Sequence, residues 1–280
     1  PVYKAWQDHR VCKAFARDEV RERVIPAYMG LIKQLDDQMG RLFAYLEESG
    51  RMDDTMIVMS SDHGDYLGDH WLGEKDLFHD ASARVPLIIY DPREEADATR
   101  GTTSDALVEG IDLAPTFLEL MGGEAKPHIL EGRSLVPILE GRQTEWRNYA
   151  ISEYDYSTRK SRLDLDLDQA DARLVMIFDG RWKYIHAEGF RPLLFDLESD
   201  PDELVDLGAE PEHEAIRAEL HEALFAWARQ HHTRITRSPE QVNRMAAGGE
   251  PPGILIGFWD EDEIRESGRK SVHPPVNLED

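Results

Sequence analysis

The chain has 280 residues, of which 41% are hydrophobic and 31% are charged, and its formal net charge at pH 7 is −24. This length and hydrophobic content allow one large core, or a main domain with a smaller one, and exclude wholesale disorder. The strong negative charge argues against nucleic acid and anionic membranes as partners, because both bind basic surfaces.

The cysteine content and the length of the apolar runs indicate the cellular compartment in which the protein is expected. The only cysteine, Cys12, excludes a disulfide within the chain and favours a reducing compartment. No apolar segment approaches the length needed to span a bilayer. No signal sequence is visible either, so we expect a cytoplasmic protein. The chain opens at Pro1 without an initiator methionine, and we expect that further polypeptide precedes it in the natural protein.

The first strongly periodic segment covers residues 28–48. Its apolar side chains recur at helical spacing, among them Leu31, Leu35 and Leu42. The pattern predicts an amphipathic helix that packs on a sheet. Pro26 is acceptable near a helix start, and Gly50 marks its end.

Residues 55–61 form an apolar run that is too short for a typical helix and ends abruptly at Asp62, His63 and Gly64. This pattern predicts a buried parallel strand whose carboxyl end reaches a polar site. Carboxylate and imidazole are both metal ligands. A simpler interpretation is that Asp62 caps the next element and that His63 is a hydrogen-bonded surface histidine.

A polar loop follows, and the chain returns to an apolar strand at residues 85–90. A polar loop between two core strands that is dense in titratable groups is a candidate functional site. Its titratable residues after the first pair include Asp65, Asp69, His70, Glu74, Lys75, His79 and Asp80.

The second half of the chain predicts an antiparallel sheet. Residues 173–178 and 181–186 flank an Asp-Gly pair, one of the strongest short signals for a hairpin. Residues 149–154 and 193–197 would add further strands, and residues 210–230 predict a covering helix. The tail beyond residue 232 contains the apolar segment 254–259, which is costly to leave in water. It either wraps back over the same subunit or docks on a neighbour, and we expect a subunit contact.

Several of these segments resemble the type I sulfatases of the alkaline phosphatase superfamily. The match is carried by residues 60–70, with the Asp-His pair and the Gly-Asp-His-Trp sequence, and by Lys75 and residues 84–88. It is closest to the phosphonate monoester hydrolase and arylsulfatase branch. Further matching segments are residues 32–46, 112–117, 131–135 and 194–201. The resemblance extends over residues 26–230 in order.

The resemblance implies an α/β fold: the C-terminal half of an alkaline-phosphatase-like α/β/α sandwich, plus a smaller antiparallel sheet with a covering helix. We expect residues 1–148 to belong to the main sulfatase domain, whose N-terminal half is missing. Residues 149–232 would form a C-terminal α+β subdomain. Residues 233–280 would form an extended arm through which the protein associates as a homo-oligomer.

The resemblance also implies a metal-dependent hydrolase of sulfate esters, or of phosphonate monoesters and phosphodiesters, acting on a small anionic substrate. Asp62 and His63 match the ligands of one divalent ion, without distinguishing Mn, Ca, Mg or Zn. Lys75 matches a lysine that contacts the transferring group. His70 would either border the substrate pocket or support other site residues without contacting the substrate.

The nucleophile expected for this family is a formylglycine, formed from the cysteine of a Cys-x-Pro-x-Arg motif in the N-terminal half. Cys12 lacks the proline and the arginine of that motif and is expected to pack as a small hydrophobe. Two alternatives stay open. The nucleophile could be a serine or threonine, as in phosphatase-type relatives, or the chain could be a non-catalytic fragment used for binding or assembly.

Overall fold

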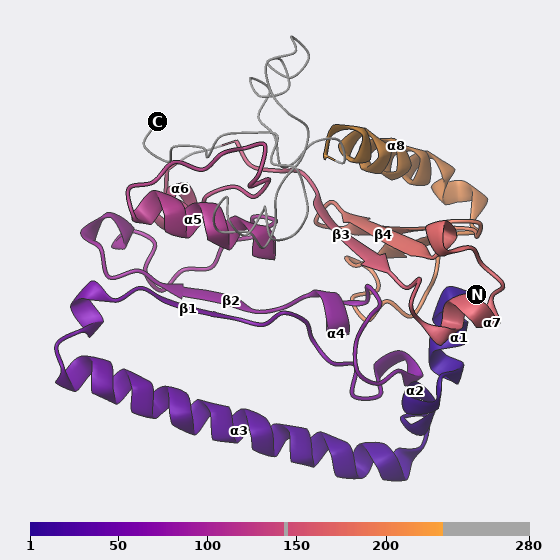
Figure 1. Ribbon diagram of the computed structural model, residues 1–280, viewed down its shortest axis with the longest axis horizontal. Coiled ribbons are helices and arrows are strands. Elements are labelled where there is room, and N and C mark those ends of the chain that lie inside the picture. The colour runs from indigo at the N-terminus through magenta and orange to yellow at the C-terminus, as the bar shows by residue number, and fades with distance from the viewer. Residues whose placement is uncertain (143–144, 232–280) are drawn as a thin grey trace, which may run out of the picture.

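The computed structural model describes residues 1–142 and 145–231. A long helix, α3 (Asp18–Glu48), runs along one side, and a two-stranded ribbon lies next to it (Figure 1). The far end holds a four-stranded sheet together with the N-terminal helices α1 (Val2–Asp8) and α2 (Arg10–Ala14). The predicted arm, with its apolar segment 254–259, lies outside the described residues.

The predicted helix is confirmed in a longer form. It begins at Asp18 rather than near residue 28, and Asp18 and Glu19 occupy its first turn, where acidic side chains interact favourably with the helix dipole. Pro26 therefore lies inside α3 instead of near its start.

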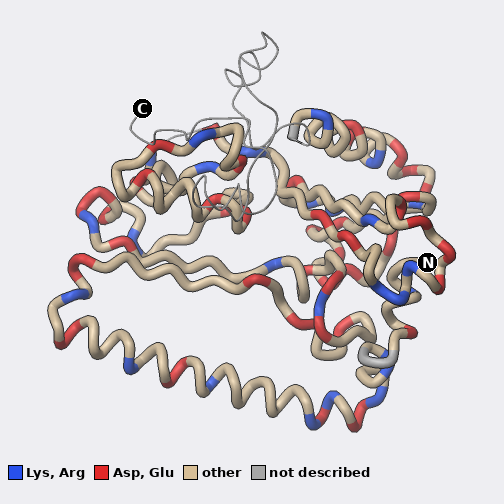
Figure 2. Tube along the Cα trace, in the orientation of Figure 1, with Lys and Arg blue, Asp and Glu red and all other residues tan. Residues whose placement is uncertain are grey.

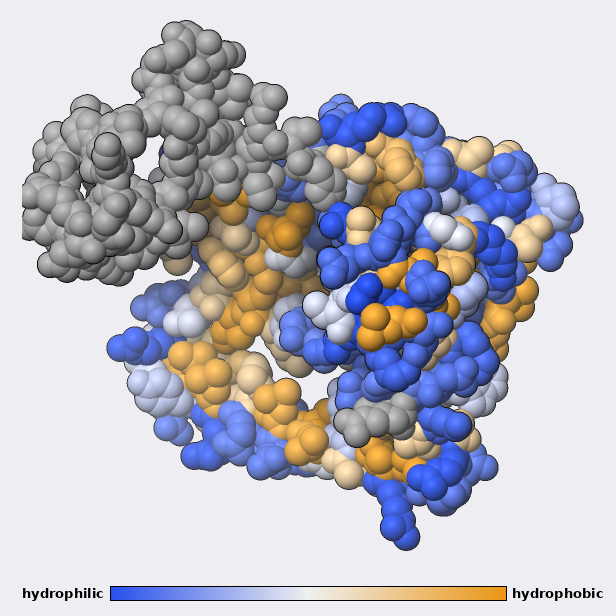
Figure 3. All heavy atoms as spheres, turned by 45° about the vertical axis from the view of Figure 1, so that its right-hand side comes forward, coloured by the Kyte–Doolittle hydropathy of each residue, from blue (hydrophilic) through white to orange (hydrophobic). Residues whose placement is uncertain are grey.

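The prediction that this helix packs on a sheet is wrong for the described part of the chain. Among the residues of α3, only Leu46 is buried. Hydrophobic atoms line both sides of an opening between α3 and the rest of the molecule (Figure 3). The large apolar residues of α3 that are exposed are Met29, Leu31, Ile32, Leu35, Leu42 and Tyr45.

Strands β1 (Ile57–Ser60) and β2 (Leu87–Tyr90) pair in antiparallel register, with Ile57 opposite Tyr90 and Ser60 opposite Leu87. The predicted buried parallel strand is therefore wrong in direction and in burial, since Met59 is 39% and Ile88 is 60% exposed. The intervening loop contains only one short α-helix, α4 (Asp80–Ala83). Without a crossover helix of full length, the chain reverses direction and returns beside β1.

Beyond the ribbon lie α5 (Leu113–Leu120) and α6 (Val136–Leu139). Asp112, at the start of α5, is fully buried, and its two carboxylate oxygens each lie 2.5 Å from a guanidinium nitrogen of Arg147. The same carboxylate accepts the backbone N–H of Glu109 and that of Arg133. This one carboxylate therefore connects the start of α5 to Arg133 and Arg147, which lie 21 and 35 positions later in the sequence.

The second sheet is antiparallel, in the order β3 (Ala150–Asp155), β4 (Arg173–Phe178), β5 (Trp182–Ala187) and β6 (Leu193–Asp196). The predicted hairpin is confirmed. Gly180 has a φ of +100°, which favours glycine, and the Asp179 carboxylate accepts the N–H groups of Arg181 and Trp182.

Helices and loops cover both faces of this sheet. On one face, Leu220 and Leu224 of α8 (Glu214–His231) pack against Ile177, Tyr184 and Leu194, which confirms the predicted covering helix. On the other face, the core combines residues of α1, α2 and part of the loop after β1. Helix α7 (Lys160–Asp164) lies against α1. The buried residues contributed by the N-terminal segments and by that loop are Val2, Trp6, Cys12, Tyr66, Leu72, Leu77 and Phe78.

Basic residues are interspersed among acidic ones along the described trace (Figure 2). Within residues 1–142 and 145–231, no helix is both long and apolar enough to cross a membrane.

Candidate functional site

The candidate site begins where β1 ends. The Gly64 N–H donates to the Ser82 carbonyl at 2.8 Å, so the two ends of the loop between β1 and β2 meet. A Cβ on Gly64 would lie 2.0 Å from the carbonyl oxygen of Ala81. Glycine is therefore required here by the close approach of α4, rather than by a left-handed backbone.

The His63 ring is oriented by its own neighbour. Its Nδ1 lies 2.7 Å from the Gly64 carbonyl oxygen, which can only accept, so Nδ1 carries the proton and Nε2 presents its lone pair. That Nε2 lies 2.6 Å from the Lys75 Nζ and 3.6 Å from Asp62 Oδ2. The structure thus brings three of the four predicted site residues together.

The accessibility of this group suits a site that binds ligands from solution. The Asp62 side chain is 86% exposed and the His63 side chain is 37% exposed. A carboxylate oxygen and an imidazole nitrogen on adjacent residues are a chemically suitable pair for a divalent ion.

Within the part of the chain that the structure describes, no group of three or more His, Cys, Asp or Glu residues could hold a metal. Asp62 and His63 therefore fit an ion only as two of its ligands. The Lys75 ammonium contacts the same Nε2 atom that an ion would use, so this contact and a metal bond to Nε2 exclude one another.

His70, the fourth predicted site residue, lies with a different group. Its ring stacks in parallel on the His79 ring, with centroids 3.6 Å apart, and Tyr66 contacts both rings edge-on. Burial lowers the pKa of His70, and burial together with His70 and Lys183 lowers the pKa of His79 to about 2. Both rings are then neutral at pH 7, which permits their close stacking.

The segment around His70 has an unusual backbone. His70 and Trp71 have φ angles of 52° and 59°, in the left-handed region that side chains rarely adopt. A hydrogen bond from Gly68 N–H to the Leu72 carbonyl closes this turn, and Gln7 Nε2 of α1 donates to the His70 carbonyl at 3.0 Å. Such strain is characteristic of functional segments.

Sequence reasoning missed a buried ionic cluster behind the site. Lys183 of β5 is 2% exposed, and its Nζ lies 2.5 Å from Asp80 Oδ1 and 2.7 Å from Glu203 Oε1. Glu203 Oε2 accepts the backbone N–H of Asp80 at 2.6 Å. Burial raises the pKa of Glu203.

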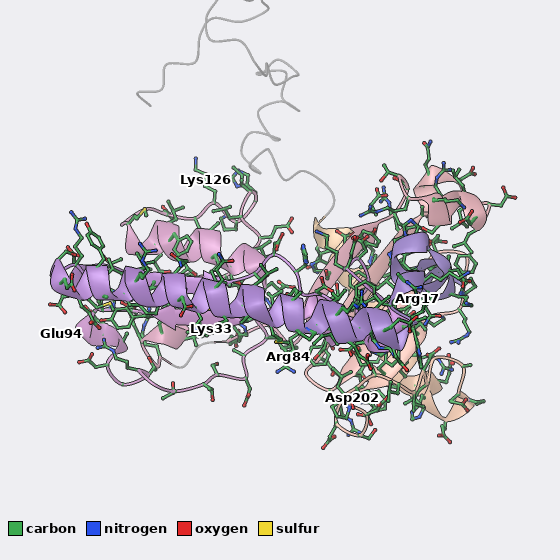
Figure 4. All side chains as sticks on the ribbon, turned by 90° about the horizontal axis from the view of Figure 1, so that it is seen from below. Arg17, Lys33, Arg84, Glu94, Lys126 and Asp202 are labelled. Carbon is green, nitrogen blue, oxygen red and sulfur yellow. The ribbon has the colours of Figure 1, made fainter. Side chains whose placement is uncertain are left out.

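Only part of this cluster had a signal in the sequence. Asp80 belongs to the titratable loop, and Glu203 follows the family-like segment 194–201, but no local pattern marks Lys183. Asp80 also accepts from Arg84 at 3.3 Å. In the view of Figure 4, Arg84 lies beside the middle of α3, and Asp202, next to Glu203, lies on the side of the second sheet.

The chain matches two family models. The model described as Sulfatase matches residues 3–123, and the one described as N-sulphoglucosamine sulphohydrolase, C-terminal, matches residues 68–230. A curated relative, the multifunctional alkaline phosphatase superfamily protein PehA of Trinickia caryophylli, is 39% identical over 211 residues, covering 74% of this chain and 40% of the relative.

Two solved structures are similar in fold and sequence. The phosphonate monoester hydrolase of Agrobacterium radiobacter has a TM-score of 0.68 and 36% identity, over 73% of this chain and 41% of that one. The phosphonate monoester hydrolase of Silicibacter pomeroyi has a TM-score of 0.71 and 31% identity, over 77% and 42%. The chain thus spans about two fifths of the length of these relatives, and the fold class predicted from its sequence is confirmed. The chain belongs to the sulfatase family of the alkaline phosphatase superfamily.

Proposed function

We propose that the protein containing this chain hydrolyses sulfate esters, or phosphonate monoesters and phosphodiesters, at a metal site to which Asp62 and His63 contribute. The observation that carries the proposal is the meeting of Asp62, His63 and Lys75 at the end of β1. The names of the relatives, which include arylsulfatase, choline-sulfatase and phosphonate monoester hydrolase, support this class of substrate.

Each residue has a separate task. The Asp62 carboxylate and the His63 Nε2 lone pair would hold the ion, and the Gly64 carbonyl fixes the tautomer that leaves Nε2 available. The Lys75 ammonium, released from Nε2, would contact an oxygen of the bound sulfuryl or phosphoryl group and stabilise the negative charge that develops there. The ion would act as a Lewis acid toward the same group.

The nucleophile and the remaining ligands are proposed to come from polypeptide outside this chain, with formylglycine expected from the family resemblance. Two observations support this. The described residues provide only two ligands. The apolar face of α3 and the ribbon residues Met59 and Ile88 are exposed, as expected for surfaces that further polypeptide of the same domain covers.

The test uses the full natural protein, stripped of metal by a chelator and then titrated with Mn²⁺, Ca²⁺, Mg²⁺ or Zn²⁺. Turnover of a chromogenic aryl sulfate and of an aryl phosphonate monoester is measured, together with the amount of metal bound per protein. Asp62→Ala and His63→Ala should lose stoichiometric metal and turnover together. Retention of both by either variant would refute the ligand assignment.

Mass spectrometry of the active protein distinguishes the nucleophiles. A cysteine converted to formylglycine supports the sulfatase-type mechanism, and an unmodified serine or threonine at that position supports the phosphatase-type alternative. A matched control is Lys33→Ala on α3, which removes a surface lysine that pairs with Asp37. It should leave metal content and turnover unchanged.

A further inference from the structure

We propose that Lys183 and Glu203 are positioning residues for the candidate site. They hold α4 in place and, through α4, the backbone beside His63. The importance of His63 for catalysis rests on the proposed function. The contacts that position α4 do not depend on that function, and hydrogen–deuterium exchange tests them without it.

The first link connects the second sheet to α4. Glu203 Oε2 accepts the N–H of Asp80, the first residue of α4, and so satisfies a helix N-terminal donor that has no partner within the helix. Lys183 Nζ contacts the Asp80 side chain at the same point, at 2.5 Å. Backbone and side chain of Asp80 are therefore both fixed by residues that lie more than 100 positions away.

The second link connects α4 to the candidate ligand. Ser82, two residues after Asp80, accepts the Gly64 N–H at 2.8 Å. The Gly64 carbonyl in turn accepts from His63 Nδ1 at 2.7 Å. Both polar groups of the Gly64 backbone are thus used, one to hold α4 and the other to orient the imidazole.

The third observation is the conformation of Glu203. Its φ is 54°, in the left-handed region that is costly for a residue with a side chain. The side chain is buried, and each carboxylate oxygen makes a separate contact, one with Lys183 and one with Asp80. A strained backbone that aims a buried carboxylate at two partners is expected where the position of those partners matters.

The two carboxylates of the cluster depend on a single buried cation. Lys183 supplies one buried ammonium between two carboxylates, and Arg84, which also reaches Asp80, is 80% exposed. Removal of the lysine charge leaves Asp80 and Glu203 facing each other without their buried cation. Repulsion between them should separate α4 from β5 and release the Ser82–Gly64 hydrogen bond.

The proposal is tested by hydrogen–deuterium exchange and mass spectrometry on the full natural protein. In Lys183→Met, peptides covering residues 62–84 should exchange at least tenfold faster, whereas peptides from β4 should be unaffected. A general loss of stability would accelerate both. Exchange of residues 62–84 at the wild-type rate in a folded Lys183→Met protein would overturn the proposal.

Two further variants keep the test decisive. Arg181→Met removes another ion pair of the same sheet, between Arg181 and Asp196, and should leave exchange of residues 62–84 unchanged. If Lys183→Met does not fold, Asp80→Ala replaces it, since this substitution removes the side chain through which Lys183 holds α4. It should also accelerate exchange in residues 62–84, and wild-type exchange in Asp80→Ala would equally overturn the proposal.

Catalysis supplies an independent readout. If the proposed function holds, Lys183→Met should lower kcat at least tenfold with a smaller change in KM, because substrate still meets Lys75 while His63 is misplaced. If residues 62–84 exchange faster in Lys183→Met but the wild-type protein has no hydrolase activity, the positioning is supported and the proposed function is refuted. If residues 62–84 of Lys183→Met exchange at the wild-type rate and the wild-type protein is active, the positioning is refuted and the proposed function is supported.

Discussion

Lys75 Nζ lies 2.6 Å from His63 Nε2, and this nitrogen is the atom through which the imidazole would bind a metal. With the proton on Nδ1, Nε2 has one lone pair, so it can accept from the ammonium or bind an ion, but not both. Under the proposed function, metal binding at His63 would therefore release the Lys75 ammonium to contact the substrate.

This competition predicts that Lys75→Met separates metal affinity from turnover. The variant should bind Mn²⁺ at least as tightly as the wild-type protein, because the competing ammonium is gone. Its kcat should fall by about 10²–10³, the range found when one group that stabilises transition-state charge is removed. Calorimetric titration with Mn²⁺ and steady-state kinetics measure the two effects, and weaker Mn²⁺ binding would contradict the competition.

The buried pair of Asp112 and Arg147 should dominate the stability of the region around α5. The Asp112 side chain is fully buried and that of Arg147 is 10% exposed. Arg147→Met should lower the free energy of unfolding by about 3–5 kcal/mol, because it leaves a carboxylate in the interior without its cation. Urea denaturation measures the change.

An exposed ion pair provides the control for that experiment. Lys4 and Asp8 lie on one face of α1, with side chains 68% and 61% exposed. Lys4→Met should change the free energy of unfolding by less than about 1 kcal/mol. An equal effect of the two substitutions would show that burial does not set the contribution of the Asp112–Arg147 pair.

The parts of the fold that the sequence predicts well are those decided by neighbours in the chain. The Asp179–Gly180 turn, its two flanking strands and the apolar face of α8 depend on local periodicity and on turn chemistry, and the structure confirms them. Asp62 and His63 are adjacent in the sequence, and the family resemblance indicates Lys75. The structure brings these three side chains together, and their role as site residues stays a prediction.

The parts that sequence reasoning missed depend on contacts over long distances. The direction of β1 relative to β2 is not encoded in the apolar pattern of either strand, because a buried parallel strand and this ribbon strand have similar composition. Asp80 and Lys183 are 103 residues apart, and an isolated lysine in a strand gives no sign that it is buried. The apolar pattern of residues 28–48 predicts the helix, but not that its apolar face is exposed in the part of the chain that the structure describes.

Two glycines should respond in opposite ways to the same substitution. Gly64→Ala places a methyl group against the Ala81 carbonyl, and backbone atoms cannot move aside as a flexible side chain can. It should lower the free energy of unfolding by about 1–3 kcal/mol and increase exchange at residues 62–84. Thermal and urea denaturation measure the stability.

Gly30 lies inside α3, and a Cβ there would meet nothing within 4 Å. Gly30→Ala should therefore raise the free energy of unfolding by about 0.5–1 kcal/mol, because alanine loses less backbone entropy in a helix than glycine does. If both alanine variants were equally stable, close packing at Gly64 would not be what requires glycine there.

The Arg181–Asp196 pair gives a prediction for pH. Asp196 is buried and accepts two hydrogen bonds from the Arg181 guanidinium, at 2.8 and 2.7 Å, and this lowers its pKa to about 2 from an ordinary value near 3.8. A carboxyl group whose pKa is lower in the folded state stabilises the fold above its unfolded pKa. That contribution is lost as pH falls through the folded pKa.

Wild-type protein should therefore exceed Arg181→Met in the free energy of unfolding at pH 7, by a small margin because Arg181 is 49% exposed and screened by solvent. The difference should persist down to about pH 4 and decline between pH 4 and pH 2, as Asp196 takes up its proton. Urea denaturation of both proteins across this range measures it. A difference that stays constant to pH 2 would mean that Arg181 acts through its contact with the Trp182 ring, at 4.9 Å, rather than through the carboxylate.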